Sequence, residues 1–191
     1  MKNVLDKFFY PKSVAIIGAT EKTEKIGYAV LRNLLDGGFK GEVYPVNPKY
    51  NQLLGKKCYA RLKDLPKAPD LVVFSLPPAR IPPLMADCKN ANVECAVVLS
   101  AGFKEAGPGG EQRFRDLKTE AAANGVRLIG PNCIGLLTPA IGLNATYAPT
   151  MPPAGQVAFI SQSGALGSAI LDWASEKKVG FSHFVSIGSM A

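Results

Sequence analysis

Short apolar runs alternate with amphipathic segments along most of the chain. Residues 13–18 form a β-branched run that ends in glycine, and residues 26–35 place their large apolar side chains on one helical stripe. This spacing predicts a strand followed by a helix. The alternation continues, with strands predicted at 42–47, 71–76, 95–100 and 126–130 and helices at 81–90 and 111–123.

Nearly every position in these predicted strands is apolar. A strand with one solvent-exposed face alternates apolar and polar residues, whereas a parallel strand covered by helices on both faces is apolar throughout. The pattern therefore predicts an α/β fold built on a Rossmann-like, doubly wound parallel sheet.

A proline-rich segment divides the chain. Three prolines in the eight residues 148–155 predict a linker, with a first domain at 1–147 and the start of a second at 156–191. The second segment shows one β-α-β pattern, with strands at 156–160 and 181–187 and a helix at 165–178. This unit is too small to form its own core, so we expect strand 181–187 to need covering by further chain or by self-association into a homo-oligomer.

Charge narrows the class of partner. The chain has 22 Lys and Arg against 15 Asp and Glu, and its net charge of +7 favours an anionic partner. The basic residues are dispersed, and only Lys56-Lys57 and Lys177-Lys178 are adjacent, so no nucleic-acid partner is predicted. A small polyanion such as a nucleotide or coenzyme A (CoA) fits this pattern better.

The apolar runs are far shorter than the roughly 18 residues of a membrane span, and the first residues do not resemble a secretory signal, so we expect a cytoplasmic protein without a membrane partner.

The cysteines form no Cys-x-x-Cys spacing and the chain has one histidine, so no metal site is predicted. We interpret the cysteines as small buried hydrophobic residues in a reducing compartment. They are Cys58, Cys88, Cys95 and Cys133.

Ligands bind open parallel sheets beyond the carboxyl ends of the strands, so the loops there are the expected site. After the first strand come Gly18, Ala19 and Thr20, and Gly27 lies where the next helix begins. Backbone N–H groups at this helix start can face a phosphate, while the alternative is an ordinary turn that needs glycine for close packing. The nine positions from Gly18 to Gly27 exclude the dinucleotide fingerprint, which needs a shorter spacing.

The second predicted strand ends at Asn47-Pro48-Lys49, without the acidic residue that accepts hydrogen bonds from the ribose of NAD. Lys49 can instead pair with a phosphate on the ribose, as in NADP or in the 3′-phosphate of CoA. NAD is therefore disfavoured, and Asn47 and Lys49 are candidate cofactor-binding residues.

The next two loops also hold candidates. Leu76 and Pro77 open a proline-rich segment that forms either a wall for an adenine or pantetheine group or simply a rigid loop. Ser100, Ala101 and Gly102 are small enough for a ligand to approach the backbone, and Ser100 can donate a hydrogen bond.

After the fifth predicted strand, Asn132 offers an amide donor and acceptor, and Cys133 is placed to lie near a thiol. Beyond the linker, Ser161-Gln162-Ser163-Gly164 joins a strand to a helix and forms either a phosphate site or a plain N-cap. The lone His183 is interpreted as a packing residue on its strand rather than as a catalyst.

Six blocks in order carry a family resemblance. They are residues 14–20, 44–49, 100–105, 130–133, 144–146 and 160–166. Together they closely resemble the ADP-forming acyl-CoA synthetase family, which includes acetate–CoA ligase, and more distantly the α subunit of succinyl-CoA synthetase. The resemblance covers the whole chain.

This resemblance implies a first domain that binds CoA and a truncated, flavodoxin-like second domain. It places Lys25, Ile26, Gly27 and Lys49 at the nucleotide end of CoA, Ser100, Ala101 and Gly102 near the pantetheine, and Asn132 and Cys133 near the thiol. It also implies that Ser161–Gly164 handles phosphate or acyl phosphate.

The family reaction interconverts acyl-CoA, ADP and phosphate with carboxylate, CoA and ATP through a phosphohistidine. The resemblance places that histidine further along the second domain, and ATP or ADP with Mg²⁺ on an ATP-grasp domain or β subunit. The chain departs from the family pattern Ser-x-Gly-Asn at Ser186-Ile187-Gly188-Ser189. We therefore expect a fragment that carries no catalytic residue and does not complete the reaction alone.

Other interpretations stay open. The chain could be the CoA-binding part of a protein lysine acetyltransferase, a CoA or nucleotide sensor, or an NADP-dependent oxidoreductase. The sequence does not predict which carboxylic acid is used.

Overall fold

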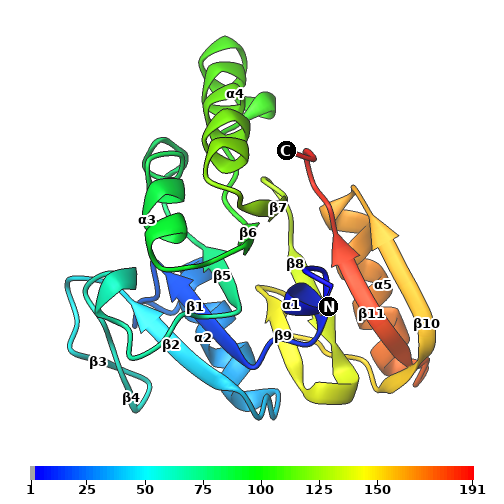
Figure 1. Ribbon diagram of the computed structural model, residues 1–191. Coiled ribbons are helices and arrows are strands. Elements are labelled where there is room, and N and C mark those ends of the chain that lie inside the picture. Colours follow the sequence, from blue (N-terminus) through cyan, green and yellow to red (C-terminus); the bar gives the residue numbers. More distant parts are fainter. Residues whose placement is uncertain (1–2) are drawn as a thin grey trace.

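The computed structural model describes residues 3–191 and contains two larger sheets (Figure 1). The first has five strands in the order β2-β1-β5-β6-β7, and every pairing is parallel. Its strands are β1 (Ser13–Ile17), β2 (Glu42–Val46), β5 (Leu71–Phe74), β6 (Cys95–Val98) and β7 (Arg127–Ile129). Each lies within the range predicted from the sequence, so the parallel sheet is confirmed.

Helices cover both faces of this sheet (Figure 1). They are α1 (Asp6–Phe9) and α2 (Ile26–Asp36) on one face and α3 (Leu84–Asn90) and α4 (Pro108–Ala123) on the other. Alternate strand residues enter two separate cores, with Ile16 and Val73 on the α2 side and Ile17 and Phe74 on the side of α3 and α4. Burial on both faces is why these strands are apolar throughout.

The second sheet has four strands in the order β10-β11-β8-β9. The strands β10 and β11 are parallel and joined by a helix, whereas β8 and β9 form an antiparallel hairpin that pairs with β11. These elements are β8 (Gly135–Thr138), β9 (Leu143–Thr146), β10 (Ala154–Ser161), α5 (Gly164–Glu176) and β11 (Phe181–Ser186).

The second sheet differs from expectation in two ways. The strand β10 begins at Ala154, inside the predicted linker, because its first residues pair with the start of β11. The β8–β9 hairpin was not predicted, and it carries residues of the predicted first domain into the second sheet. The segment 1–147 therefore supplies two strands to the sheet that completes the β-α-β unit.

A small core forms between the second sheet and α5. It contains Ile134 and Leu137 from the hairpin region, Leu171 from α5, and Phe181 and Phe184 from β11. The hairpin thus covers β11, which is not the open strand that the sequence predicted. The edge strands of this sheet are β9, which is buried against α2, and β10, where Val157 is 45% and Ile160 67% exposed.

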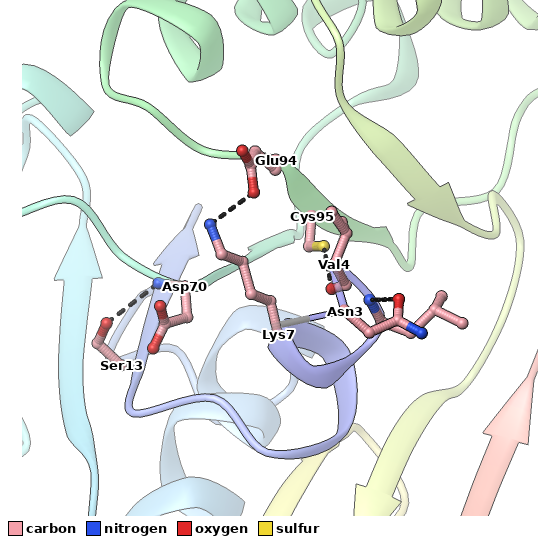
Figure 2. A network of polar contacts seen from close by, with 8 residues as sticks. Asn3, Val4, Lys7, Ser13, Asp70, Glu94 and Cys95 are labelled. Atoms are coloured by element: carbon pink, nitrogen blue, oxygen red, sulfur yellow. Dashed lines mark hydrogen bonds and ion pairs between the residues drawn. The ribbon is translucent and has the colours of Figure 1, made fainter. Parts of the chain in front are cut away.

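The N-terminal segment ties together the strand starts of the first sheet (Figure 2). The Lys7 ammonium lies 2.6 Å from the Glu94 carboxylate, and the Cys95 thiol donates to the Val4 carbonyl at 3.4 Å. Residue Phe8 of α1 is buried in the α2-side core. These contacts anchor residues 4–8 at the edge of the sheet where the strands begin.

His183 lies on β11 and contacts the same N-terminal segment. Its ring is edge-on to Phe9 and Tyr10, with centroids 5.1 and 5.6 Å apart. The residue comes near the start of β11, away from the strand's carboxyl end. His183 therefore packs against the N-terminal segment in this structure.

Short elements complete the fold. A two-stranded hairpin, β3 (Gln52–Leu53) with β4 (Lys56–Lys57), follows β2. Single 3₁₀ turns lie at Leu62–Asp64, Pro78–Arg80, Lys104–Ala106 and Pro139–Ile141. Among residues 3–191, no helix has the length and apolar character that crossing a membrane requires.

Candidate functional site

All five parallel strands end at the same edge of the first sheet. Along that edge the loops follow the strand order, with 47–49 after β2, 18–27 after β1, 76–77 after β5, 100–102 after β6 and 132–133 after β7. Four strand spacings of about 4.8 Å put roughly 19 Å between the outermost loops. The predicted residues of the first domain therefore share one long edge, which suits an extended ligand lying across the strands.

The loop after β1 is shaped by two glycines. Gly18 has a φ of +95°, and a Cβ there would collide with the Ser75 carbonyl oxygen. A Cβ on Gly27 would collide with the Gly18 carbonyl oxygen. Close packing thus explains why both residues are glycine, and the same packing keeps the loop backbone at the N-terminus of α2, where an anion is favoured.

Three exposed lysines lie at this end of the edge, and the loop after β1 also carries the exposed carboxylates of Glu21 and Glu24. Lys22 and Lys25 lie in the loop after β1 and Lys49 lies after β2, and all three are exposed. Within the described part of the chain, none of them is in an ion pair. Together with the helix start, their ammonium groups fit the diphosphate and ribose phosphate of a nucleotide-like ligand. Ile26, which is 38% exposed, lies next to them in the sequence.

The middle loops are tied to each other by side chains. The Ser100 hydroxyl donates to the Leu76 carbonyl at 2.6 Å. Its hydrogen is therefore used within the protein, and its oxygen can still accept a hydrogen bond from a ligand. The Glu105 carboxylate accepts from the Gly102 amide, which is thereby occupied. Ala101 and Pro77 remain exposed on these loops, and Leu76 is half-buried.

The Glu105 carboxylate also accepts from the Phe103 amide. Partial burial raises the pKa of this carboxyl, but the amide hydrogen bonds and the nearby Arg113 lower it further, so the net pKa lies below 4.5. A lowered native pKa means that the stabilisation is present above the unfolded-state pKa and is lost as the pH falls through the native value.

Replacing Glu105 with glutamine is therefore expected to lower the free energy of unfolding at pH 7 by up to about 1 kcal/mol. The difference from the wild type should shrink as the pH falls below about 4.5, because the carboxyl is then protonated first in the unfolded protein and, at lower pH, in the native protein. Urea unfolding at pH 7 and pH 3 measures this. Glu21→Gln is the control, since that exposed side chain makes no hydrogen bond with the described residues; an equal loss in both variants would contradict the assigned role.

The loop after β7 contacts the second sheet. The Ser189 amide donates to the Pro131 carbonyl at 2.8 Å, and the Ile187 amide donates to the Ser161 carbonyl at 2.9 Å. The Lys104 ammonium lies 3.5 Å from the Ser189 carbonyl oxygen. The structure therefore brings the predicted thiol-end loop close to the predicted phosphate turn, although the two are separated by the linker in sequence.

The turn at 161–164 is a capped helix start. The Ser163 hydroxyl accepts from the Leu166 amide at 3.2 Å, and the Ser161 hydroxyl accepts from the Ser163 amide at 3.1 Å. Ser163 is thus the N-cap of α5, which the sequence left open as an alternative, and Ser161 closes the turn before it. The amides of Gly164 and Ala165, the first two residues of α5, have no partner inside the helix and remain available to an anion. The side chain of Gln162 is exposed beside them.

Cys133 is buried, and its thiol donates to a carbonyl of β6 at 3.3 Å. Burial raises the pKa of this thiol to about 12, so it stays protonated at neutral pH and is a poor nucleophile. Burial likewise raises the pKa of Cys88 to about 12 and of Cys95 to about 11. All four cysteines are buried, as predicted. The polar residue that this loop exposes is Asn132, which has a φ of +55°.

Two cavities lie elsewhere on the protein. One, of about 420 Å³, runs along α2 between Tyr28, Arg32 and Tyr147. The other, of about 650 Å³, lies near the strand starts between Tyr10 and Lys40. In the described part of the chain neither is lined by a predicted ligand residue, so the candidate site is the open loop edge itself.

Sequence reasoning missed residues that shape these loops. The Thr20 hydroxyl lies 3.2 Å from the Tyr50 hydroxyl, and Glu105 holds the loop after β6. The missed residues are Tyr50, which directly follows the block 44–49, and Glu105, which ends the block 100–105. Their roles depend on which loops become neighbours, and the sequence does not show this.

Comparison with known proteins places these features in a family. Residues 12–139 match the model of a CoA binding domain, and residues 154–191 match that of a succinyl-CoA ligase like flavodoxin domain. The chain is 43% identical over 187 residues to acetate–CoA ligase [ADP-forming] I of Archaeoglobus fulgidus, covering 98% of this chain and 27% of the relative. It is 39% identical to the α subunit of acetate–CoA ligase [ADP-forming] II of Pyrococcus furiosus, covering 98% of this chain and 41% of the relative.

A solved structure agrees over nearly the whole chain. The dinucleotide forming acetyl-coenzyme A synthetase 1 of Ca. Korarchaeum cryptofilum, in complex with phosphate and ADP, superposes with a TM-score of 0.91 and 41% identity over 98% of this chain and 40% of that one. The chain thus spans well under half the length of these relatives. It belongs to the CoA-binding domain family, as the CoA-binding part of a protein similar to the ADP-forming acetate–CoA ligases.

Proposed function

We propose that this chain binds CoA for an ADP-forming acyl-CoA ligase that interconverts acyl-CoA, ADP and phosphate with carboxylate, CoA and ATP. The observation that carries the proposal is the order of the loops along one sheet edge. Exposed lysines lie at the β2 and β1 end, small residues lie in the middle, and the loop at 130–133 lies at the other end, against the second sheet.

This order suits the chemistry of CoA from one end to the other. Lys49 and Lys25 would hold the ribose phosphate and diphosphate, and the loop at 100–102 would follow the pantetheine. Asn132 would lie near the thiol, where the backbone bonds to the 187–191 turn bring the first amides of α5 close. We propose that these amides bind phosphate or the phosphate of an acyl phosphate.

The remaining parts of the reaction lie outside these residues. We propose that ATP or ADP is bound with Mg²⁺ by an ATP-grasp domain or β subunit, and that the whole protein is a homo-oligomer. The exposed apolar residues of β10 support a cover of this kind, since an open apolar strand invites pairing. Four buried, unpaired cysteines suit the reducing conditions of the cytoplasm, where we propose that the protein acts.

Calorimetric titration with CoA, dephospho-CoA and NADPH tests the CoA assignment. We expect CoA to bind more tightly than dephospho-CoA, because only CoA carries the 3′-phosphate. Lys49→Ala should weaken CoA binding by about 1.5–3 kcal/mol, the magnitude of a charge-assisted hydrogen bond, and should leave dephospho-CoA nearly unaffected.

Lys40→Ala is the matched control. It removes the same charge from an exposed lysine between α2 and β2, at the opposite end of the sheet, so its CoA affinity should equal that of the wild type. Equal binding of CoA and dephospho-CoA by the wild type would overturn the role of Lys49. Preferential binding of NADPH would favour an oxidoreductase instead.

A further inference from the structure

We propose that Asn47 is a positioning residue, which fixes the Lys49 ammonium against the loop after β1 and so makes the site selective for a ligand with a phosphate on its ribose. The inference rests on the proposed CoA-binding function. It assigns Asn47 a role different from direct contact with the ligand, and it gives Tyr50 a supporting part.

Both ends of the Asn47 side chain form hydrogen bonds within the protein. Its amide nitrogen donates to the Ala19 carbonyl at 2.8 Å, and its amide oxygen accepts from the Lys49 amide at 3.0 Å. The reverse orientation would place oxygen against oxygen and N–H against N–H, so the two partners fix the amide. Because both ends of the amide bond to the loops, we assign Asn47 the role of holding these loops together.

The two hydrogen bonds of the Asn47 side chain have different structural roles. The bond to the Lys49 amide closes an Asx turn, which sets the backbone direction at Lys49. The bond to Ala19 fastens that turn to the neighbouring loop after β1. The Asn47 backbone is held as well, because its amide donates to the Tyr59 carbonyl at 2.8 Å.

A second tie lies on the other side of Lys49. The Tyr50 hydroxyl lies 3.2 Å from the Thr20 hydroxyl, which also accepts from the Lys22 amide at 3.3 Å. Lys49 is therefore flanked by two residues that each bond to the loop after β1. The exposed lysine stands between them.

Selectivity for the ribose phosphate depends on the bonds of Asn47 and Tyr50, because an unsupported Lys49 would discriminate only weakly between phosphates. An exposed lysine loses rotamer entropy when its ammonium is held in one place, and an exposed ion pair contributes little unless its geometry is fixed. Lys22 and Lys25 offer charge to any phosphate nearby, so charge alone does not single out the ribose phosphate. Holding the backbone of Lys49 relative to the diphosphate loop supplies the missing distance constraint.

The test compares affinities for CoA and dephospho-CoA by calorimetric titration of the full chain. The readout is the ratio of the two affinities, since general damage to the site would lower both alike. Asn47→Ala is expected to reduce CoA affinity about tenfold and dephospho-CoA affinity less than about threefold, so that the ratio approaches that of Lys49→Ala. Tyr50→Phe, which keeps the ring and loses the hydroxyl, should lower the ratio about threefold.

Asn51→Ala is the matched control. Asn51 lies in the same segment, is exposed, and its side chain makes no hydrogen bond with the described residues, so the ratio should equal that of the wild type. Thermal unfolding of each variant shows whether it folds. If Asn47→Ala does not fold, the affinity ratio of Tyr50→Phe decides the test.

Two failures can be told apart. If the wild type does not prefer CoA, the assignment of Lys49 in the proposed function fails and this inference fails with it. If the wild type prefers CoA but Asn47→Ala and Tyr50→Phe keep the full ratio, only the positioning role is overturned.

Discussion

Replacing Phe184 with alanine is expected to lower the free energy of unfolding by about 3–5 kcal/mol. The ring is fully buried in β11 and stacks on Phe159, with centroids 5.7 Å apart and planes 4° from parallel. The core around it is small, so few side chains can move in to fill the cavity. Urea unfolding followed by circular dichroism measures the loss.

Ile160→Ala provides the control on the same sheet. This side chain is 67% exposed, so its removal should change the free energy of unfolding by no more than about 0.5 kcal/mol. If the two variants lost the same stability, the core between the second sheet and α5 would not contribute as the structure indicates.

Replacing Gly27 with alanine is expected to weaken CoA binding at least about tenfold, equivalent to about 1.4 kcal/mol. Alanine is the better helix former by about 1 kcal/mol, but its Cβ would collide with the Gly18 carbonyl oxygen. Relieving that collision moves the loop that carries Ala19 and Thr20, at a cost in stability of about 1–3 kcal/mol. Calorimetric titration and urea unfolding measure the two effects.

Gly109→Ala makes the same chemical change without the collision. Gly109 lies in α4, and the nearest heavy atom to an added Cβ is the end of the Arg113 side chain at 3.6 Å. This variant should gain up to about 1 kcal/mol of stability and bind CoA as the wild type does. A Gly27→Ala protein that was also more stable, with unchanged CoA affinity, would contradict the packing argument.

The parallel sheet could be predicted from the sequence because its cause is local. Burial on both faces makes each strand apolar at every position, and the intervening helices show their own stripe. The β8–β9 hairpin could not be predicted in this way. Each of its strands has four residues, and its partner β11 lies beyond the linker, so its stability comes from contacts distant in sequence.

For the candidate site, the grouping of the loops could be predicted from the sequence, but their hydrogen bonds could not. A parallel sheet places the loop after each strand at one edge, so Gly18, Lys49 and Cys133 could be grouped from the sequence alone. The hydrogen-bond partner of each polar group could not be predicted from the sequence. The Ser100 hydroxyl donates to the Leu76 carbonyl, for example, because folding brings these two loops within hydrogen-bond distance.

The hairpin has a consequence for building chimeras from members of this family. A crossover placed in the proline-rich stretch before β10 would set β8 and β9 of one parent against β10 and β11 of the other. Such a hybrid would have to match foreign side chains at Leu137 and Phe184 across one sheet. A crossover that keeps each sheet from a single parent lies earlier, between the end of β7 and Ile134, where Gly130, Pro131 and Asn132 form the turn between the two sheets.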